Sequence, residues 1–494
     1  MSSNRGRNTQ TLQITARTSS SGLWRGRGGR RVTGPAGRRG AERFRRCVRL
    51  ISGRGVRTAR SLPLTSSSNY RALFGNRNYF RVFAAGLGSV AGSAIASVCL
   101  IWIVAIETGS ALDVALLGTA NLVAAILFST LGGTLVDRYN RRRLMILSDV
   151  ARGAALAVAV AVLALRGFNF PVLLFGEAVL GAFTVLFNPA EQAIIPSLVP
   201  GGQVADANGL VRSSRSTLQF VGVSVGGVLV FAVGPIWGIA ANAMTFALSA
   251  ALLTGMAVPE VLAGAAGGGT RPSYFAELGA GFAWLWKAKG FFQLTLSALV
   301  FNFAAAVVST FLVFYATDLL HGSALVYAAL LAAEVAGTAI GSLLVGRMGA
   351  VRYAGKAWVV PYGVLSGLVV LALALAPSTP IALVALFSLG AFGGFAGTAW
   401  LTAAQLLVPS TMQGRYFGID SLGSIAIIPA GQIGGALLIA ATSLRETYLI
   451  AALVWIVFGL VFLAPRELWH LGAPVGTAAT LRSDGDEVGT PGLP

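Results

Sequence analysis

Two acidic residues stand inside long apolar stretches of the chain, where an ionised group is most costly. Glu177 lies in LLFGEAVLG and Glu334 lies in LLAAEVAGT. A carboxyl in such surroundings can bind and release a proton when its access to water changes, which is the chemistry of an ion-coupled process. The alternative is a protonated carboxyl that only hydrogen-bonds a neighbouring backbone group or hydroxyl. We treat Glu177 and Glu334 as candidates for proton coupling, with the structural alternative open.

Uncharged polar residues share these apolar stretches. They could line the path of a substrate, or they could pair across helices, an interaction of about 1 kcal/mol in membranes. The candidates for a substrate path are Asn121, Gln219, Asn302 and Gln405, together with Asn242 and Gln432. Asp149 and Arg152, three residues apart, are expected to form a structural ion pair on one helix face.

A cluster of charge interrupts the apolar sequence at GGTLVDRYNRRR, residues 132–143. Arginines that close a short turn between two membrane helices cannot enter lipid, so they hold the turn on one side. Asp137, at the end of a helix, can accept hydrogen bonds from an arginine or from the N-terminus of another helix. The simpler interpretation is that the cluster only keeps this turn on one side of the membrane.

The elements that must position these residues are membrane helices. Of the 494 residues, 55% are hydrophobic and 11% are charged, whereas soluble proteins carry about 25% charged residues. About twelve apolar stretches are long enough to cross a bilayer as helices. The sequence therefore predicts an all-α polytopic membrane protein. The stretches are 82–106, 114–136, 144–165, 169–187, 216–234, 236–257, 291–316, 325–346, 357–376, 380–402, 417–440 and 446–464.

Lysine and arginine predict the orientation, because loops rich in them stay in the cytoplasm. With the N-terminus inside, the loops on the opposite side hold only Arg166 and Arg445. We expect both termini in the cytoplasm and a multi-pass protein of the cell membrane. Glu177 and Glu334 then lie ~12 and ~13 Å from the outer ends of their helices.

Five regions follow from composition. Residues 1–70 form a basic tail without an apolar period, 71–257 the first six-helix bundle, 258–290 a cytoplasmic linker with an interfacial helix, 291–465 the second bundle, and 466–494 a cytoplasmic tail. Equivalent segments of the two bundles are similar in sequence: GGTLVDRYNRRR aligns with GSLLVGRMGAVR, and VGVSVGG aligns with PAGQIGG. Parallel repeats of six helices are a transporter plan.

The N-terminal tail has several interpretations. Residues 1–60 contain 16 arginines and one acid, Glu42. Such a segment could bind RNA or anionic lipid, serve as an organellar transit peptide, result from an over-long gene model, or be a solvated tail without a role. We favour the last two interpretations and expect no nucleic-acid partner.

The charge cluster resembles the G-x-L-x-D-R-x-G-R-R signature of the major facilitator superfamily, with Asn140 in place of the second glycine; asparagine tolerates the left-handed turn expected there. Residues 70–257 are similar to the drug-efflux and siderophore-export branch, which includes macrolide efflux proteins, through RNYFRVF, ETGSALDVALLG and FNPAEQAIIPSLVP. The resemblance implies a major facilitator fold of two six-helix bundles. It also implies a cytoplasmic latch between the bundles that favours the outward-open state, formed by Gly133, Asp137, Arg138, Arg141 and Arg142.

The resemblance implies secondary active export of an amphipathic small molecule, such as an antibiotic or a siderophore, by proton antiport. A phosphate loop is absent from the sequence, as are H-E-x-x-H and a nucleophile with its base, so we expect no ATP-driven step, no enzyme, no metal and no cofactor. The expected partners are the substrate, protons and the lipid bilayer, and we expect a monomer. Two departures from the exporters are Ser93, where they usually carry an acid, and GVSVGG, where Val223 replaces the proline of the antiporter signature. An importer, a lipid or lysolipid flippase, and a non-transporting receptor or scaffold remain alternatives.

Overall fold

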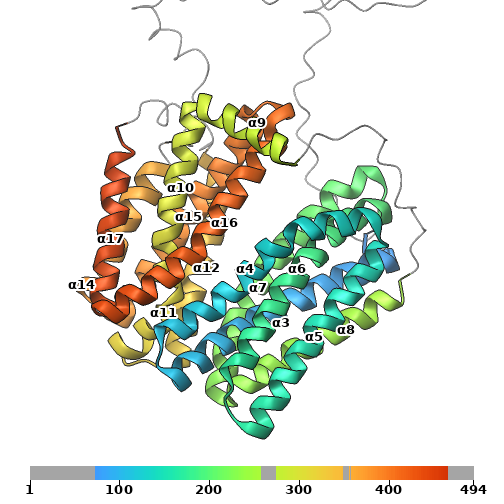
Figure 1. Ribbon diagram of the computed structural model, residues 1–494, viewed down its shortest axis with the longest axis horizontal. Coiled ribbons are helices and arrows are strands. Elements are labelled where there is room, and N and C mark those ends of the chain that lie inside the picture. The colour runs from blue at the N-terminus through green and yellow to red at the C-terminus, as the bar shows by residue number, and fades with distance from the viewer. Residues whose placement is uncertain (1–72, 257–273, 349–354, 356–357, 465–494) are drawn as a thin grey trace, which may run out of the picture. The chain divides into compact units, whose positions relative to one another are not determined.

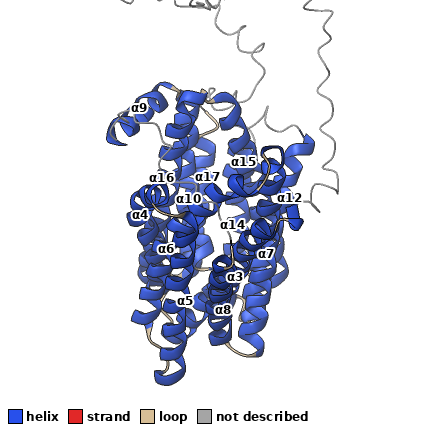
Figure 2. Cartoon of the chain, turned by 90° about the vertical axis from the view of Figure 1, so that its right-hand side faces the viewer, coloured by secondary structure: helices blue, strands red, loops and turns tan. Residues whose placement is uncertain are grey.

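The computed structural model describes residues 73–256, 274–348, 355 and 358–464, all within the compact unit Ser67–Pro494. We describe this unit by itself; the predicted tails 1–70 and 466–494 and the start of the linker lie outside the described residues. In the described ranges every regular element is a helix (Figure 2). The all-α prediction is therefore confirmed.

Six long helices form the first half of the unit. Polar side chains begin several of them: the amide oxygen of Asn76 accepts from two backbone N–H groups at the start of the first helix, and Ser110 and Asn169 cap the second and fourth helices in the same way. Such caps satisfy backbone donors that the helix itself leaves unpaired. The helices are α3 (Arg77–Thr108), α4 (Ala111–Arg138), α5 (Arg141–Arg166), α6 (Phe170–Leu198), α7 (Val204–Ala232) and α8 (Pro235–Thr254), with the short helix η1 (Gly201–Gln203) before α7.

The second half repeats this plan with more interruptions. The linker helix α9 (Tyr274–Lys287) precedes it, at the place where an interfacial helix is predicted. Two π-helical segments, η2 (Tyr315–Leu319) and η4 (Trp358–Leu365), continue or begin longer helices, and the second contains Pro361. The other elements are α10 (Lys289–Thr310), α11 (Leu312–Phe314), α12 (Ala324–Met348), α14 (Ser366–Leu375), α15 (Thr379–Leu407), α16 (Ser410–Ala441) and α17 (Leu444–Val461).

Eleven spans in the described ranges are long and apolar enough to cross a membrane. The predicted stretch 417–440 falls on α16, whose apolar part, Ala426–Ala441, is shorter than the others. The start of α16 is polar because it carries Arg415 and the buried Asp420. The membrane-helix prediction is otherwise reproduced stretch by stretch.

The two halves pack their helices in the same pattern. In the first half α3 packs against α7 and α8, and α4 packs against α6. In the second half α10 packs against α16 and α17, and α12 packs against α15. Between the halves, α4 packs against α16 and α7 packs against α12. These two contacts are equivalent, because α4 corresponds to α12 and α7 corresponds to α16 in the repeat. This pattern is that of two structural repeats.

Contacts between the halves gather at one end of the helices, which we call the closed end. There Thr119 donates a hydrogen bond of 3.0 Å to Gln432 Oε1, and the rings of Trp102 and Tyr327 stack with centroids 6.2 Å apart. Gly227 lies against Ala328 so closely that a Cβ on the glycine would collide with the alanine side chain. In Figure 1 the two bundles lie close together around α11 and spread apart toward α9.

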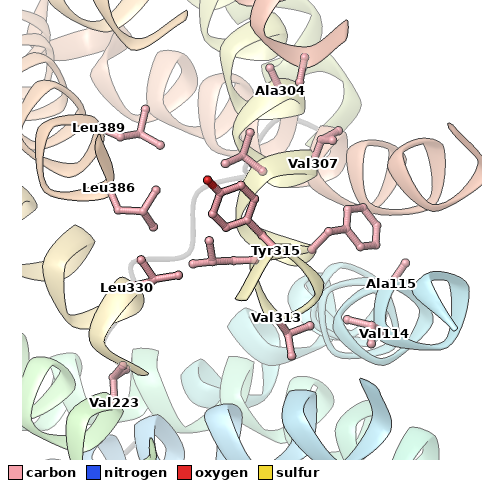
Figure 3. Packing of buried hydrophobic residues seen from close by; sticks show 14 of the residues in the cluster. Val114, Ala115, Val223, Ala304, Val307, Val313, Tyr315, Leu330, Leu386 and Leu389 are labelled. Carbon is pink, nitrogen blue, oxygen red and sulfur yellow. The ribbon is translucent and has the colours of Figure 1, made fainter. Parts of the chain in front are cut away.

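The hydrophobic core supports the same division. One cluster of buried residues takes members from both halves, and Figure 3 shows Val114, Ala115 and Val223 of the first half near Tyr315 and Leu330 of the second. A second cluster, which includes Tyr79, Met145 and Leu253, belongs to the first half alone and lies away from the closed end. The halves therefore share a core at the closed end.

Candidate functional site

The larger of two described cavities lies in the first half and has a volume of about 590 Å³. All six helices α3 to α8 line it, and Gln432 of α16 is the one lining residue from the second half among the described residues. Apolar lining such as Leu100, Ile101 and Leu180 alternates with polar side chains. Of the sequence-predicted residues, those brought together here are Asn121, Glu177, Gln219, Asn242 and Gln432.

Glu177 is held by Asn121 across the packing of α6 against α4. The amide Nδ2 of Asn121 donates to Glu177 Oε2 at 2.8 Å and approaches the Glu177 backbone carbonyl at 3.3 Å. One turn along α6, Gly181 lies against the Asn121 carbonyl, where a Cβ would collide with the backbone. The glycine lets the two helices approach closely enough for this hydrogen bond. A predicted coupling residue and a predicted path residue thus form one pair.

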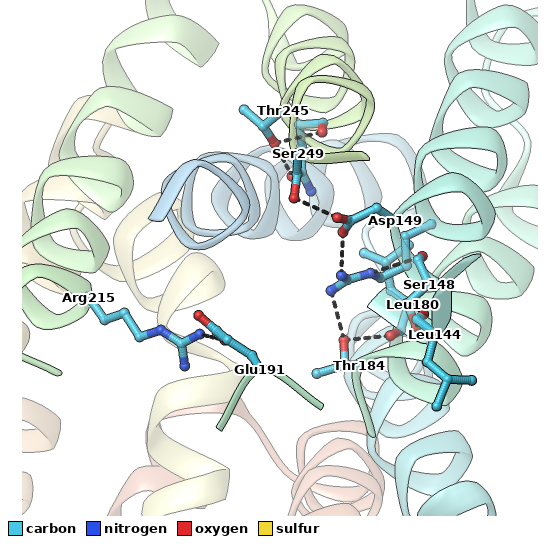
Figure 4. Close-up of polar contacts among 11 residues, drawn as sticks. Leu144, Ser148, Asp149, Leu180, Thr184, Glu191, Arg215, Thr245 and Ser249 are labelled. Atoms are coloured by element: carbon cyan, nitrogen blue, oxygen red, sulfur yellow. Dashed lines mark hydrogen bonds and ion pairs between the residues drawn. The ribbon is translucent and has the colours of Figure 1, made fainter. Parts of the chain in front are cut away.

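Arg152 lines the cavity and forms a buried network, whose members Asp149 and Ser249 are labelled in Figure 4. Its Nη2 lies 2.6 Å from Asp149 Oδ1, which confirms the predicted ion pair, and Ser249 Oγ donates to Asp149 Oδ2 at 2.5 Å. The guanidinium carbon lies 4.7 Å from the ring centroid of Phe187 and 4.4 Å from that of Phe246. Aromatic faces attract a guanidinium, so the rings and the carboxylate together keep this charge buried.

A second ion pair, between the buried Glu191 of α6 and the partly exposed Arg215 of α7, was not predicted (Figure 4). Glu191 is 2% exposed, and Arg215 lines the cavity. Two signals for it exist in the sequence: an acid within FNPAEQAIIPS and an arginine at the start of an apolar stretch. Neither signal indicates that the two residues pair, because they are separated by a turn between helices.

Glu334 lies in a smaller cavity of about 120 Å³ in the second half, lined also by Ser309, Tyr362 and Trp455. Within the described part of the chain its carboxyl has no hydrogen-bond or ion-pair partner. Asn302 and Gln405 line neither of these two cavities. The structure therefore separates the two coupling candidates into different halves.

The charge cluster at the end of α4 is described in part. Arg141 donates to the carbonyl of Ala193 at 2.8 Å, and Arg142 donates to the carbonyls of Leu253, at 2.8 Å, and Thr254. These carbonyls lie at the C-terminal ends of α6 and α8, where the helix dipole favours a cation. Both arginines thus bind within the first half.

The other latch residues, Gly133, Asp137 and Arg138, belong to α4 by their backbone, but their side chains lie outside the described residues. A latch between the halves stays a prediction. The expectation of a left-handed turn at Asn140 is wrong, because its φ is −62° and its ψ is 116°. The Asn140 side chain instead caps α5 by accepting from the backbone N–H groups of Arg142 and Arg143.

Comparison with known proteins places this arrangement in a family. The family model described as transmembrane secretion effector matches residues 70–469. The multidrug efflux pump Tap of Mycobacterium tuberculosis is 26% identical over 427 residues, which cover 81% of this chain and 98% of that pump. Macrolide efflux protein A of Streptococcus pyogenes is 25% identical over 275 residues, or 55% of this chain and 66% of that protein.

Solved structures show the same fold at low identity. The nucleoside transporter NupG superimposes with a TM-score of 0.62 and 14% identity, covering 78% of this chain and 97% of that one. The match of the family model indicates a transporter rather than an enzyme. The repeated helix pattern and the apolar spans agree with a multi-pass membrane protein of the major facilitator fold. The chain belongs to the transmembrane secretion effectors, a family of major facilitator transporters.

Proposed function

We propose that this chain exports amphipathic small molecules, antibiotics among them, and that inward flow of protons drives the export. The main support for this proposal is the 590 Å³ cavity, in which the membrane-embedded carboxyl of Glu177 lies among apolar and hydrogen-bonding side chains. The relatives named as multidrug and macrolide efflux proteins support the direction of transport and the class of substrate.

Alternating access gives the cavity its role. With both termini in the cytoplasm, the closed end faces the outside, so a substrate enters the cavity from the inner side. Separation of α7 from α12 and of α4 from α16 opens the closed end and releases the substrate. The loops at this end hold Gly109, Gly167 and Gly234, each with a positive φ that a glycine adopts without strain.

The carboxyl of Glu177 couples this movement to protons. A proton from the outside neutralises the carboxyl when the closed end opens, and the proton leaves toward the cytoplasm when the cavity opens inward. Asn121 is suited to both states, because its amide can donate to a carboxylate and also to the carbonyl oxygen of a protonated carboxyl. Asn121 and Gln219 belong to the substrate path in this proposal.

The experiment is accumulation of ethidium and of a macrolide in cells that express the chain, with and without a protonophore. Lower accumulation than in control cells, restored by the protonophore, is the expected result. Higher accumulation than in control cells would indicate an importer. Unchanged accumulation of both compounds, together with faster movement of a labelled lysolipid between leaflets, would indicate a flippase.

A further inference from the structure

Three polar groups on the wall of the large cavity lack a hydrogen-bond partner among the described residues: Ser89 Oγ, Asn242 Nδ2 and Arg215 Nε. All three residues line the cavity, and they come from α3, α8 and α7. Ser89 is 5% exposed and Asn242 is fully buried. Buried polar groups in native proteins nearly always have a partner, so three unpaired groups on one wall indicate a missing acceptor.

The three groups follow one face of α3. A Cβ built on Gly86 would lie 2.3 Å from Glu191 Oε1 and 3.5 Å from Arg215 Nη2. A Cβ built on Gly92 would lie 2.2 Å from Thr245 Oγ1 and 2.6 Å from Asn242 Oδ1. Ser89 is three residues from each glycine, so it shares their face at a distance of about 4.5 Å along the helix axis. The two glycines let the Glu191–Arg215 ion pair and Asn242 approach α3 on either side of Ser89.

The charges on this wall favour an acceptor that carries negative charge. Arg152 and Arg215 line the cavity, whereas Asp149 and Glu191, the carboxylates paired with them, are buried and do not line it. Arg215 donates to Glu191 through Nη2, which leaves its Nε–H free. The remaining lining acid, Glu177, accepts from Asn121. The lining of the cavity therefore contains the cationic member of each ion pair and three polar groups without a partner among the described residues.

We propose that Ser89, Asn242 and Arg215 bind the carboxylate of the transported molecule, so that the substrates include amphipathic organic acids. The carboxylate oxygens accept from the hydroxyl, the amide and the guanidinium Nε–H. The apolar part of the substrate lies against lining such as Val90, Leu100 and Leu180. This inference rests on the proposed function, because it names the chemical class that the export cavity accepts.

Equilibrium dialysis of the full chain in lipid nanodiscs tests the inference with three probes of one size: 2-naphthoate, 2-naphthylmethanol and protonated 2-naphthylmethylamine. We expect 2-naphthoate to bind about tenfold more tightly than the alcohol, because its hydrogen bonds are charge-assisted. We expect the ammonium probe, like the alcohol, to bind less tightly than the acid. Equal binding of the acid and the alcohol, or tighter binding of the ammonium probe, would overturn the proposal.

Substitutions locate the site. Ser89→Ala and Asn242→Ala should each weaken 2-naphthoate binding about fivefold or more and leave the alcohol unchanged, since only the acid uses these donors fully. The matched control is Ser224→Ala, because the Ser224 hydroxyl already donates to the Phe220 carbonyl and the residue does not line the cavity. If Ser89→Ala and Ser224→Ala have the same effect, the three residues do not form the site.

The binding assay needs no gradient, so the two proposals fail separately. If the chain prefers 2-naphthoate but transports neither ethidium nor a macrolide, the binding-site proposal stands and the export proposal is wrong. If the chain exports both compounds but shows no preference for the acid, the export proposal stands and the binding-site proposal is wrong. Ser89→Ala also removes an unpaired buried hydroxyl, so it should fold as well as the unmodified chain.

Discussion

At the scale of single residues, the cavity is defined by the partners of its charged groups. Glu177 has an amide partner, whereas Asp149 and Glu191 each have an arginine. Breaking an ion pair in a low dielectric is costly, so each arginine stabilises the charged form of its carboxylate. The Glu177 carboxyl has a neutral partner instead, which supports the proposal that Glu177, and not Asp149 or Glu191, couples transport to protons in the first half.

Glu177→Gln should fold, reach the membrane and lose proton-coupled export. Glutamine keeps the size of the protonated acid and can still bond Asn121, but it cannot release a proton. The measurement is ethidium uptake into inverted membrane vesicles over a range of pH, with the exposed acid Glu446 changed to Gln as the control. Uptake at the unmodified rate with the same pH dependence would contradict the proposal, and Glu334 would be tested next.

Arg152→Met should destabilise the chain more than the double change Asp149→Asn with Arg152→Met. The single change leaves the Asp149 carboxyl buried without its cation, a loss of about 3–5 kcal/mol. The double change leaves a neutral amide that Ser249 can still bond. Thermal unfolding in nanodiscs, followed by tryptophan fluorescence, measures the difference. Equal melting temperatures for the two variants would show that the pair contributes little.

The sequence predicted part of this site. Glu177 and Asn121 are recognisable because each is polar within an apolar stretch, and Asp149 and Arg152 because they are one helical turn apart. The pairing of Glu191 with Arg215 depends on how α6 and α7 approach across a turn, which no local pattern encodes. Asn302 and Gln405 have the same local signal as Asn121, yet they line neither described cavity.

At the scale of helices, glycines determine which elements approach closely. The glycines of GVSVGG have two functions: Gly222 and Gly226 lie against α3, and Gly227 lies against α12 in the other half. Small residues at helix contacts let backbones approach, which gives membrane helices their packing energy. Which of these glycines faces the other half depends on the tertiary arrangement and cannot be read from the motif.

Gly227→Ala should open the closed end. Its new methyl group would collide with the Ala328 side chain and push α7 away from α12. Spin labels placed at the exposed Leu112 of α4 and Leu437 of α16 give the distance between the halves by electron paramagnetic resonance. We expect a larger population of long distances than in the unmodified chain.

Gly209→Ala is the control for this experiment, because it lies on the same helix and its Cβ would meet nothing within 4 Å. Its distance distribution should match that of the unmodified chain. If both glycine variants give the same distribution as the unmodified chain, the contact between Gly227 and Ala328 does not hold the closed end together.

At the scale of the whole molecule, the apolar stretches predicted the helices and the internal echoes predicted two similar halves. Both follow from local physics, since a bilayer requires helices of a set length with satisfied backbones. The end at which the halves meet could not be predicted. It depends on contacts such as Thr119 with Gln432, which join residues more than 300 positions apart.

The arginine distribution predicts that Ser110 and Ser378 lie outside the cell. Both are in turns between helices, at the start of α4 and of α15. Cysteines placed there, with Cys47 changed to Ser, should react with a membrane-impermeant maleimide in intact cells. Cys99 is buried and should stay silent. Reaction only after the cells are opened would reverse the orientation and place the closed end inside.

Deletion of residues 1–60 should leave insertion and export intact. The segment is rich in arginine and lacks an apolar period, so we expect no packed structure to be lost with it. Membrane fractionation and the ethidium assay measure both properties against the full chain. Loss of the truncated chain from the membrane fraction would identify the segment as a targeting element.

The lining of the large cavity has a consequence for how selectivity is inherited. Nearly every described lining residue comes from the helices α3 to α8, and Gln432 alone comes from the partner half. A chimaera that joins residues 71–257 of this chain to the second half of a relative should therefore recognise the same compounds as this chain. Substitutions that accumulate in the second half can change the speed of the cycle while leaving the range of cargo unaltered, so the two halves are free to diverge under different selective pressures.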